Sequence, residues 1–190
     1  MEDPDSELIA RVAAGDVGGA DALVRRYARR ITSVAHRMLG DAHEAEDVTQ
    51  EVFLRTWREA PRWKPGQAKF ETWMHRVALN LCYDRLRRRR ERSDPEAGLA
   101  TPDPAAGADE AWLSAQRTAR VRAALAQLPE RQRAAIALCY YEEMPQREAA
   151  AALEVSVDAL ESLLARGRRA LQAALADVAD DLLGEVGDGR

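Results

Sequence analysis

Residues 70–92 read FETWMHRVALNLCYDRLRRRRER, and the two faces of this stretch differ in chemistry. Helical spacing places Trp73, Val77 and Leu81 in one apolar row, which predicts packing against a core. Another face carries Arg76, Asn80, Tyr83, Arg87 and Arg90. That face suits a polyanion, because a guanidinium pairs with phosphate oxygens and an aromatic ring can stack on an unpaired base. The alternative is a basic helix that only faces water.

Composition predicts an all-α protein of one or two small domains. The chain has 190 residues, of which 46% are hydrophobic, 32% charged and only 5% aromatic, as in a folded helix-rich protein. Its net charge of −4 is unevenly spread. Acids gather at 2–7, 41–51, 94–110 and 177–188, and arginines at 85–92 and 166–169. The local field therefore still permits a nucleic-acid partner.

Several classes of function are not supported by any motif. No apolar run approaches the roughly 20 residues that span a bilayer, and the acidic start MEDPDSEL is unlike a signal peptide, so we expect a cytoplasmic protein without membrane contact. Cys82 and Cys139 lie far apart in apolar helical contexts and are expected to be buried hydrophobes. No histidine shows ligand spacing. We expect no catalytic residue, metal, cofactor or small-molecule substrate.

Toward the N-terminus, the sequence predicts three helices. Residues 6–39 form two of them around a glycine turn, Gly40 ends the second, and Asp41 with Glu44 has the spacing of an N-cap. In the third, at 42–60, an inner face holds Ala45, Val48, Val52 and Thr56. Asp47, Gln50, Glu51 and Leu54 lie elsewhere on the helix. An acidic stripe with an apolar centre fits a basic protein partner, and a solvated helix face is the alternative.

A loop and a linker flank the basic helix. Pro61 ends the third helix, and residues 62–69 form a loop in which Trp63, Lys64 and Lys69 could hold a flipped base or single strand. Trp63 could equally just cover the core. Residues 93–108 hold prolines, glycines and acids without periodicity, which predicts a flexible linker between domains at 6–92 and 109–176.

The second domain has the proportions of a helix-turn-helix. Pro129 opens a helix in which Ile136, Leu138, Cys139, Tyr140 and Tyr141 are predicted to be largely buried. A short helix at 146–153, the turn Glu154-Val-Ser, and a longer helix from Val157 to at least Leu175 follow, with Ser156 as its N-cap. Its outer residues include Glu161, Ser162, Arg166 and Arg169, with Arg168 at the margin. Such a row suits base edges and phosphates, and a plain helical hairpin is the alternative. The acidic tail at 177–190 is expected to fray.

Three stretches in this order resemble the bacterial extracytoplasmic-function sigma factors, group IV of the sigma-70 family. They are LVRRYARRITSVAHRMLGDAHEAEDVTQEVFLRTWR, FETWMHRVALNLCYDRLRRRR and LPERQRAAIALCYYEEMPQREAAAALEVSVDALESLLARGRRAL. The resemblance implies a region 2-like domain, a region 4-like domain and no region 3. The implied function is an alternative sigma factor that takes core RNA polymerase to specific promoters, assists melting and is held by an anti-sigma factor.

The resemblance also implies roles for residues. Asp47, Gln50 and Glu51, with Leu54 beside them, would bind core polymerase. The segment at 64–69 and the helix from Phe70 to Arg90 would capture and melt the minus-ten element, with Asn80 as a base reader. Its contacts would be Lys64, Lys69, Phe70, Arg76, Asn80, Tyr83, Arg87 and Arg90. The helix at 156–169 would read the minus-thirty-five element through Ser156, Glu161, Ser162, Arg166, Arg168 and Arg169.

One motif departs from the family pattern, and two other functions compete. Many members have Thr-Val-Lys-Ser-Arg where this chain has Ala159-Leu-Glu-Ser-Leu163, so weaker phosphate attraction and altered base preference are expected. A decoy that only titrates an anti-sigma factor would have no need of the arginines at 87–90 and 166–169. An ordinary helix-turn-helix repressor would leave the acidic helix unexplained and would normally need a dimer face.

Overall fold

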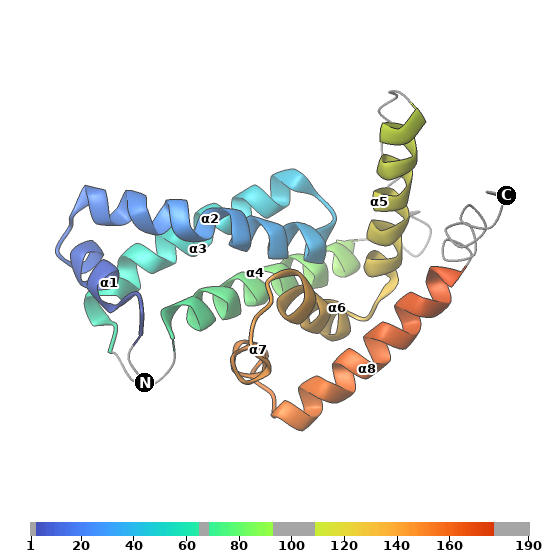
Figure 1. The fold of residues 1–190 in the computed structure, drawn as a ribbon. Helices are drawn as coiled ribbons and strands as arrows, with labels where there is room; N and C mark the ends of the chain where they lie inside the picture. The colour runs from blue at the N-terminus through green and yellow to red at the C-terminus, as the bar shows by residue number, and fades with distance from the viewer. Residues whose placement is uncertain (1–2, 65–68, 93–108, 177–190) are drawn as a thin grey trace, which may run out of the picture.

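The computed structural model describes residues 3–64, 69–92 and 109–176, and these ranges are mainly helical (Figure 1). No strand occurs within them, which confirms the predicted all-α class. The predicted linker at 93–108, the tail at 177–190 and loop residues 65–68 lie outside the described residues. Across the described ranges, no helix is both long and apolar enough to cross a bilayer.

The N-terminal module contains α1 (Ser6–Ala13), α2 (Val17–Leu39), α3 (Ala42–Glu59), the short 3₁₀ turn η1 (Ala60–Arg62) and α4 (Phe70–Arg92). The helix ends follow the predicted signals. Gly40 ends α2 at φ 70°, a conformation that glycine adopts without a Cβ penalty, and the Asp41 side chain accepts from the Glu44 amide at 2.9 Å. These caps fix the sharp reversal that lays α3 against α2.

The predicted inner face of α3 is confirmed, because Ala45, Val48, Val52 and Thr56 are all fully buried. On α4, Leu81 is buried and Trp73 and Val77 are partly buried against the same core. The fully buried side of α4 carries Met74, Ala78 and Cys82, so the predicted apolar row lies at the margin of the core-facing side and not at its centre.

Two acids near the N-terminus are buried, which composition did not predict. Asp3 Oδ2 accepts from the Phe70 amide at 2.7 Å and so satisfies a donor at the first turn of α4. Asp5 accepts from the Arg26 guanidinium and the Tyr27 hydroxyl. Burial, followed by the Asp5 contact, raises the pKa of Tyr27 and keeps its phenol protonated. Asp3 and Asp5 thus stabilise the positions of α4 and α2 through buried hydrogen bonds.

The C-terminal module contains α5 (Asp109–Gln127), α6 (Glu130–Ile136), the π-helical turn η2 (Ala137–Tyr141), α7 (Gln146–Leu153) and α8 (Val157–Ala174). Its last two helices form the predicted helix-turn-helix. Glu154 turns the chain in the left-handed region at φ 54°, and Ser156 Oγ accepts from the Ala159 amide at 3.1 Å. Helix α8 ends at Ala174, one residue before the predicted minimum.

The predicted burial of the tyrosines after α6 is wrong. Tyr140 and Tyr141 are 51% and 40% exposed, and Cys139 is only half-buried, whereas Ile136 and Leu138 are buried as predicted. The turn at 137–141 is π-helical, so it takes in one more residue than an α-turn and changes the direction of the side chains that follow. Arg37 of α2 stacks on the exposed Tyr141 ring at 3.8 Å.

The two modules pack against each other. Helix α4 contacts α7, and α2 contacts α5, α6 and η2 (Figure 1). Buried apolar residues of both modules form a single cluster. Arg133 of α6 reaches across and donates from Nη1 to the Met38 carbonyl at 2.5 Å, near the end of α2. A joint core suits modules this small, because each alone has little apolar surface to bury.

Candidate protein and nucleic-acid interfaces

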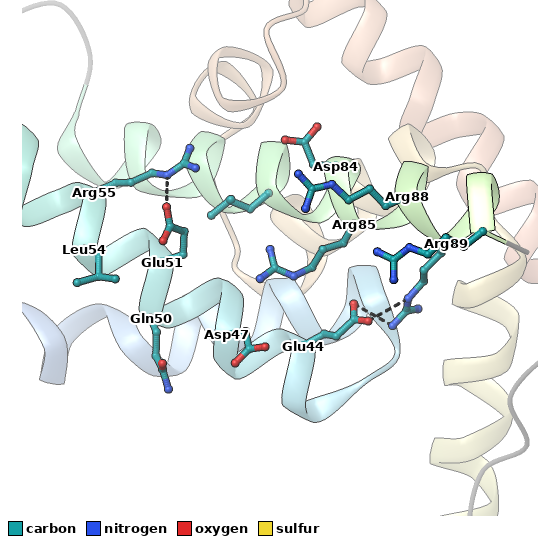
Figure 2. Close-up of a pocket in the computed structure, with 12 residues that line it drawn as sticks. Glu44, Asp47, Gln50, Glu51, Leu54, Arg55, Asp84, Arg85, Arg88 and Arg89 are labelled. Carbon is teal, nitrogen blue, oxygen red and sulfur yellow. Dashed lines mark hydrogen bonds and ion pairs between the residues drawn. The ribbon is translucent and has the colours of Figure 1, made fainter.

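A groove of about 590 Å³ runs between α3 and α4 (Figure 2). All four residues predicted to bind core polymerase line it: Asp47, Gln50, Glu51 and Leu54. They point away from the α2–α3 core because α3 buries its opposite face. Leu54 is 48% exposed and supplies the apolar centre that the sequence predicted.

The two walls of this groove carry opposite charge. Glu51 on the α3 wall pairs with Arg55 at 2.8 Å, and the hydrogen bond from Arg55 lowers the pKa of the Glu51 carboxyl. Glu44 pairs with Arg89 of α4 at 3.0 Å, as Figure 2 shows. Asp47 and Gln50 remain exposed on the α3 side. A partner that enters the groove therefore meets acids and a leucine on one side and arginines on the other.

The α4 wall was missed by sequence reasoning. It consists of Leu81, Asp84, Arg85, Arg88, Arg89 and Arg92. Leu81, Arg85, Arg88 and Arg92 recur at intervals of four, three and four residues, which is a single row along a helix. The row begins at Leu81, which the sequence assigned to the core. Helical spacing from Leu81 would therefore have predicted that the three arginines form a basic wall.

Three cations of the predicted minus-ten face pair with acids of the C-terminal module. Lys69 contacts Glu148 of α7, and Arg76 Nη1 lies 3.4 Å from Glu154 Oε1 in the turn after α7. A third pair joins Arg90 Nη2 to Glu130 Oε1 of α6 at 3.3 Å. The sequence did not predict these pairs.

The two central polar residues of that face lie in a pocket between the modules. Asn80 and Tyr83 line a space of about 260 Å³ with Glu130, Arg131 and residues 152–154. Asn80 is exposed and Tyr83 is partly buried. Burial raises the pKa of Tyr83 to about 12, so its phenol remains protonated and able to donate. Both side chains thus face the C-terminal module.

The remaining predicted minus-ten residues lie in different environments. Lys64 is exposed, and Arg87 pairs with Asp84 of its own helix at 2.9 Å. Phe70 is fully buried, with its ring edge-on to Trp63 at 4.8 Å and stacked on Trp73 at 5.3 Å. Trp63 is partly buried against the core, in agreement with the structural alternative for this residue. The structure therefore does not bring all eight residues onto one surface.

The outer residues of α8 are exposed. Leu160 and Leu164 are buried toward α6, and Gly167 sits so close to it that an added Cβ would lie 3.2 Å from Ile136 Cγ1. The exposed residues include Ser156, Glu161, Ser162, Arg166, Arg168 and Arg169. Arg169 makes one long hydrogen bond of 3.4 Å to the Ala165 carbonyl. The predicted minus-thirty-five residues are thus all exposed, with Glu161, Ser162, Arg166 and Arg169 opposite the contact with α6 and Arg168 at its margin.

Comparison with known proteins decides the family. The model of sigma-70 region 2 matches residues 23–92, and that of sigma-70 region 4 matches residues 118–171. The ECF RNA polymerase sigma factor SigW of Bacillus subtilis is 30% identical over 188 residues, covering 94% of this chain and 100% of SigW. This chain belongs to the extracytoplasmic-function (ECF) sigma factors of the sigma-70 family. The predicted resemblance is confirmed.

Other relatives of this sigma factor agree. The ECF sigma factor SigE of Mycolicibacterium smegmatis is 37% identical over 159 residues, covering 82% of this chain, which spans only 61% of that protein. Among solved structures, CnrH in complex with the cytosolic domain of CnrY superposes with a TM-score of 0.72 at 28% identity, covering 92% of this chain and 99% of CnrH. Sigma factor RpoE of Bartonella quintana, in complex with the anti-sigma factor NepR, shares the fold with a TM-score of 0.64 at 21% identity, covering 82% of this chain and 96% of RpoE.

Proposed function

We propose that this ECF sigma factor binds core RNA polymerase through the α3–α4 groove and directs it to specific promoters. The observation that carries the proposal is the groove itself. Four residues chosen from the sequence motif, Asp47, Gln50, Glu51 and Leu54, line one groove of a family member. An acidic wall with an exposed leucine favours a basic, partly apolar partner surface, because complementary charge steers association and fixes orientation.

The promoter contacts in this proposal divide between the modules. The α4 face from Lys69 to Arg90 would hold the unpaired minus-ten strand, and Asn80 would read a flipped base there. The outer row of α8 would read the minus-thirty-five duplex, with Arg168 and Arg169 on phosphates. The chain would perform no catalysis, because core polymerase supplies the chemistry. Its place of action would be the cytoplasm, together with promoter DNA.

An anti-sigma factor is the proposed regulator. CnrH, which shares 28% identity with this chain, was solved with the cytosolic domain of CnrY bound. A protein partner that covers the groove would compete with core polymerase for the same acidic wall.

The competing functions are less consistent with the surfaces. A decoy that only titrates an anti-sigma factor would not need the exposed row of Arg166, Arg168 and Arg169 on α8. A repressor that acts without polymerase would not need the α3–α4 groove. In vitro transcription with purified core enzyme over a promoter library separates all three. A sigma factor shifts start-site choice to a defined promoter class, whereas unchanged start sites would refute the proposal.

Replacing Arg76 and Asn80 by alanine is expected to impair open-complex formation more than polymerase binding. Both residues lie on α4, on the far side of the helix from the arginine wall of the groove, so core affinity should remain. Permanganate footprinting on a matched promoter measures melting, and fluorescence anisotropy measures core binding. An equal open-complex yield would contradict the assignment of α4.

Replacing Arg166 by alanine is expected to relax base preference at one promoter position. A side chain that reads a base edge contributes about 1–3 kcal/mol of discrimination. The effect is measured as the affinity of the full-length Arg166→Ala variant for each duplex of a minus-thirty-five library. The Arg168→Ala variant is measured in parallel. If Arg166→Ala weakens all sequences equally, as expected for Arg168→Ala, then Arg166 is only a phosphate contact.

A further inference from the structure

Acidic residues of the C-terminal module meet the cations of the α4 face at three places. Glu148 contacts Lys69, Glu154 lies 3.4 Å from Arg76, and Glu130 lies 3.3 Å from Arg90. These are three of the five cations that the sequence assigned to the minus-ten strand. Each carboxylate holds its cation as a phosphate oxygen would, because both anions accept from the same donors.

The same contact borders the polar centre of the face. Asn80 and Tyr83 lie in the intermodule pocket beside Glu130 and Glu154. A nucleotide strand along α4 would need the space that α7 and its flanking turns occupy. The closed arrangement and minus-ten binding are therefore mutually exclusive.

The C-terminal module makes more buried contacts with α2 than with α4. Arg30 Nε pairs with Glu142 at 3.0 Å, and the Glu142 side chain is only 5% exposed and also accepts from Ser33 at 2.9 Å. Arg133 donates from its buried position to the Met38 carbonyl. By contrast, two of the three pairs on α4 are more exposed: the side chains of Arg76 and Glu154 are 39% and 62% exposed, and those of Arg90 and Glu130 69% and 27%. The side chains of the third pair, Lys69 and Glu148, are 26% and 16% exposed. Exposed pairs are weak and screened by salt, so the two exposed contacts on α4 open more readily.

We propose that Glu130, Glu148 and Glu154 form an electrostatic latch that closes the C-terminal module over the minus-ten face of α4, with the contacts on α2 as its hinge. The latch rests on the proposed function, since it regulates the same face. Promoter phosphates and latch carboxylates compete for the same cations. Free protein is thereby kept from single-stranded DNA until the modules are drawn apart.

The test compares the full-length triple variant Glu130→Gln, Glu148→Gln, Glu154→Gln with a control that loses the same charge elsewhere, Glu7→Gln, Glu46→Gln, Glu59→Gln. The probe is a fluorescein-labelled pool of random 12-nucleotide single-stranded DNA, without polymerase. We expect the latch variant to bind the pool at least about fivefold more tightly than the control, because freed cations add electrostatic, sequence-independent affinity. Equal affinity of the two variants would overturn the latch.

A distance measurement follows the opening directly. Dyes at Arg62→Cys and Ala151→Cys, with Cys82 and Cys139 replaced by alanine, report the separation between the N-terminal module and α7. We expect energy transfer between the dyes to be lower in the latch variant. In the protein that keeps the three glutamates, we expect energy transfer to fall when KCl is raised from 50 to 500 mM. The salt series decides the question even if the latch variant loses helical circular dichroism. A separation that neither change lengthens would refute the latch, and promoter-directed transcription by the wild type would leave the proposed function standing.

Discussion

Reversing Asp47 and Glu51 to lysine is expected to abolish detectable binding to core RNA polymerase while the fold stays intact. Both carboxylates line the α3 wall of the groove. Lysines there would turn an acidic wall basic and face Arg85 and Arg88 across the groove with like charge. Removing or opposing charges at an interface costs about 2–5 kcal/mol or more, which corresponds to about 30- to 4,000-fold or more in affinity.

The fold should tolerate this reversal because neither side chain supports the core. Asp47 is exposed, and Glu51 pairs with Arg55 of the same helix in a partly exposed contact that contributes little to stability. Biolayer interferometry with immobilised core enzyme measures the affinity, and circular dichroism checks the helices. Glu46→Lys with Glu59→Lys places the same charge change elsewhere on α3 and should retain binding. If the groove variant bound core polymerase with unchanged affinity, this would contradict the assignment of the α3–α4 groove as the polymerase-binding surface.

Local signals in the sequence were sufficient for the helices and for two of the three surfaces. The glycine at 40 followed by Asp41 and Glu44 predicts a reversal, and the period of Ala45, Val48 and Val52 fixes which side of α3 is inward. Once that side is known, Asp47, Gln50 and Glu51 must lie together. Likewise Ser156 and the leucines of α8 determine its outer row.

Contacts between the modules could not be predicted in the same way. Arg76 and Glu154 are separated by 78 residues, and no periodicity or cap relates two such positions. The buried Asp3 and Asp5 have a similar origin, because their partners Phe70 and Tyr27 lie 67 and 22 residues away. The exposed tyrosines after α6 were missed for another reason: a π-turn changes the register that α-helical spacing assumes.

Replacing Phe70 by alanine is expected to lower the free energy of unfolding by about 3–5 kcal/mol. The family resemblance places Phe70 among the minus-ten contacts, yet its side chain is fully buried between Trp63 and Trp73. Truncation would leave a cavity beneath both indoles and at the first turn of α4, where Asp3 accepts from the Phe70 amide. Urea unfolding followed by circular dichroism measures the change.

Two comparisons separate a core role from a DNA role. Phe70→Leu keeps most of the apolar volume and should cost less than about 1.5 kcal/mol, whereas the exposed Lys64→Ala should leave stability nearly unchanged. If Phe70 only stacked on a base, alanine would reduce promoter melting without loss of stability. A normal urea midpoint for Phe70→Ala would therefore contradict the core assignment. A large shift would mean that Phe70 acts on DNA through the position of α4, because the helix begins at the residue that this core holds in place.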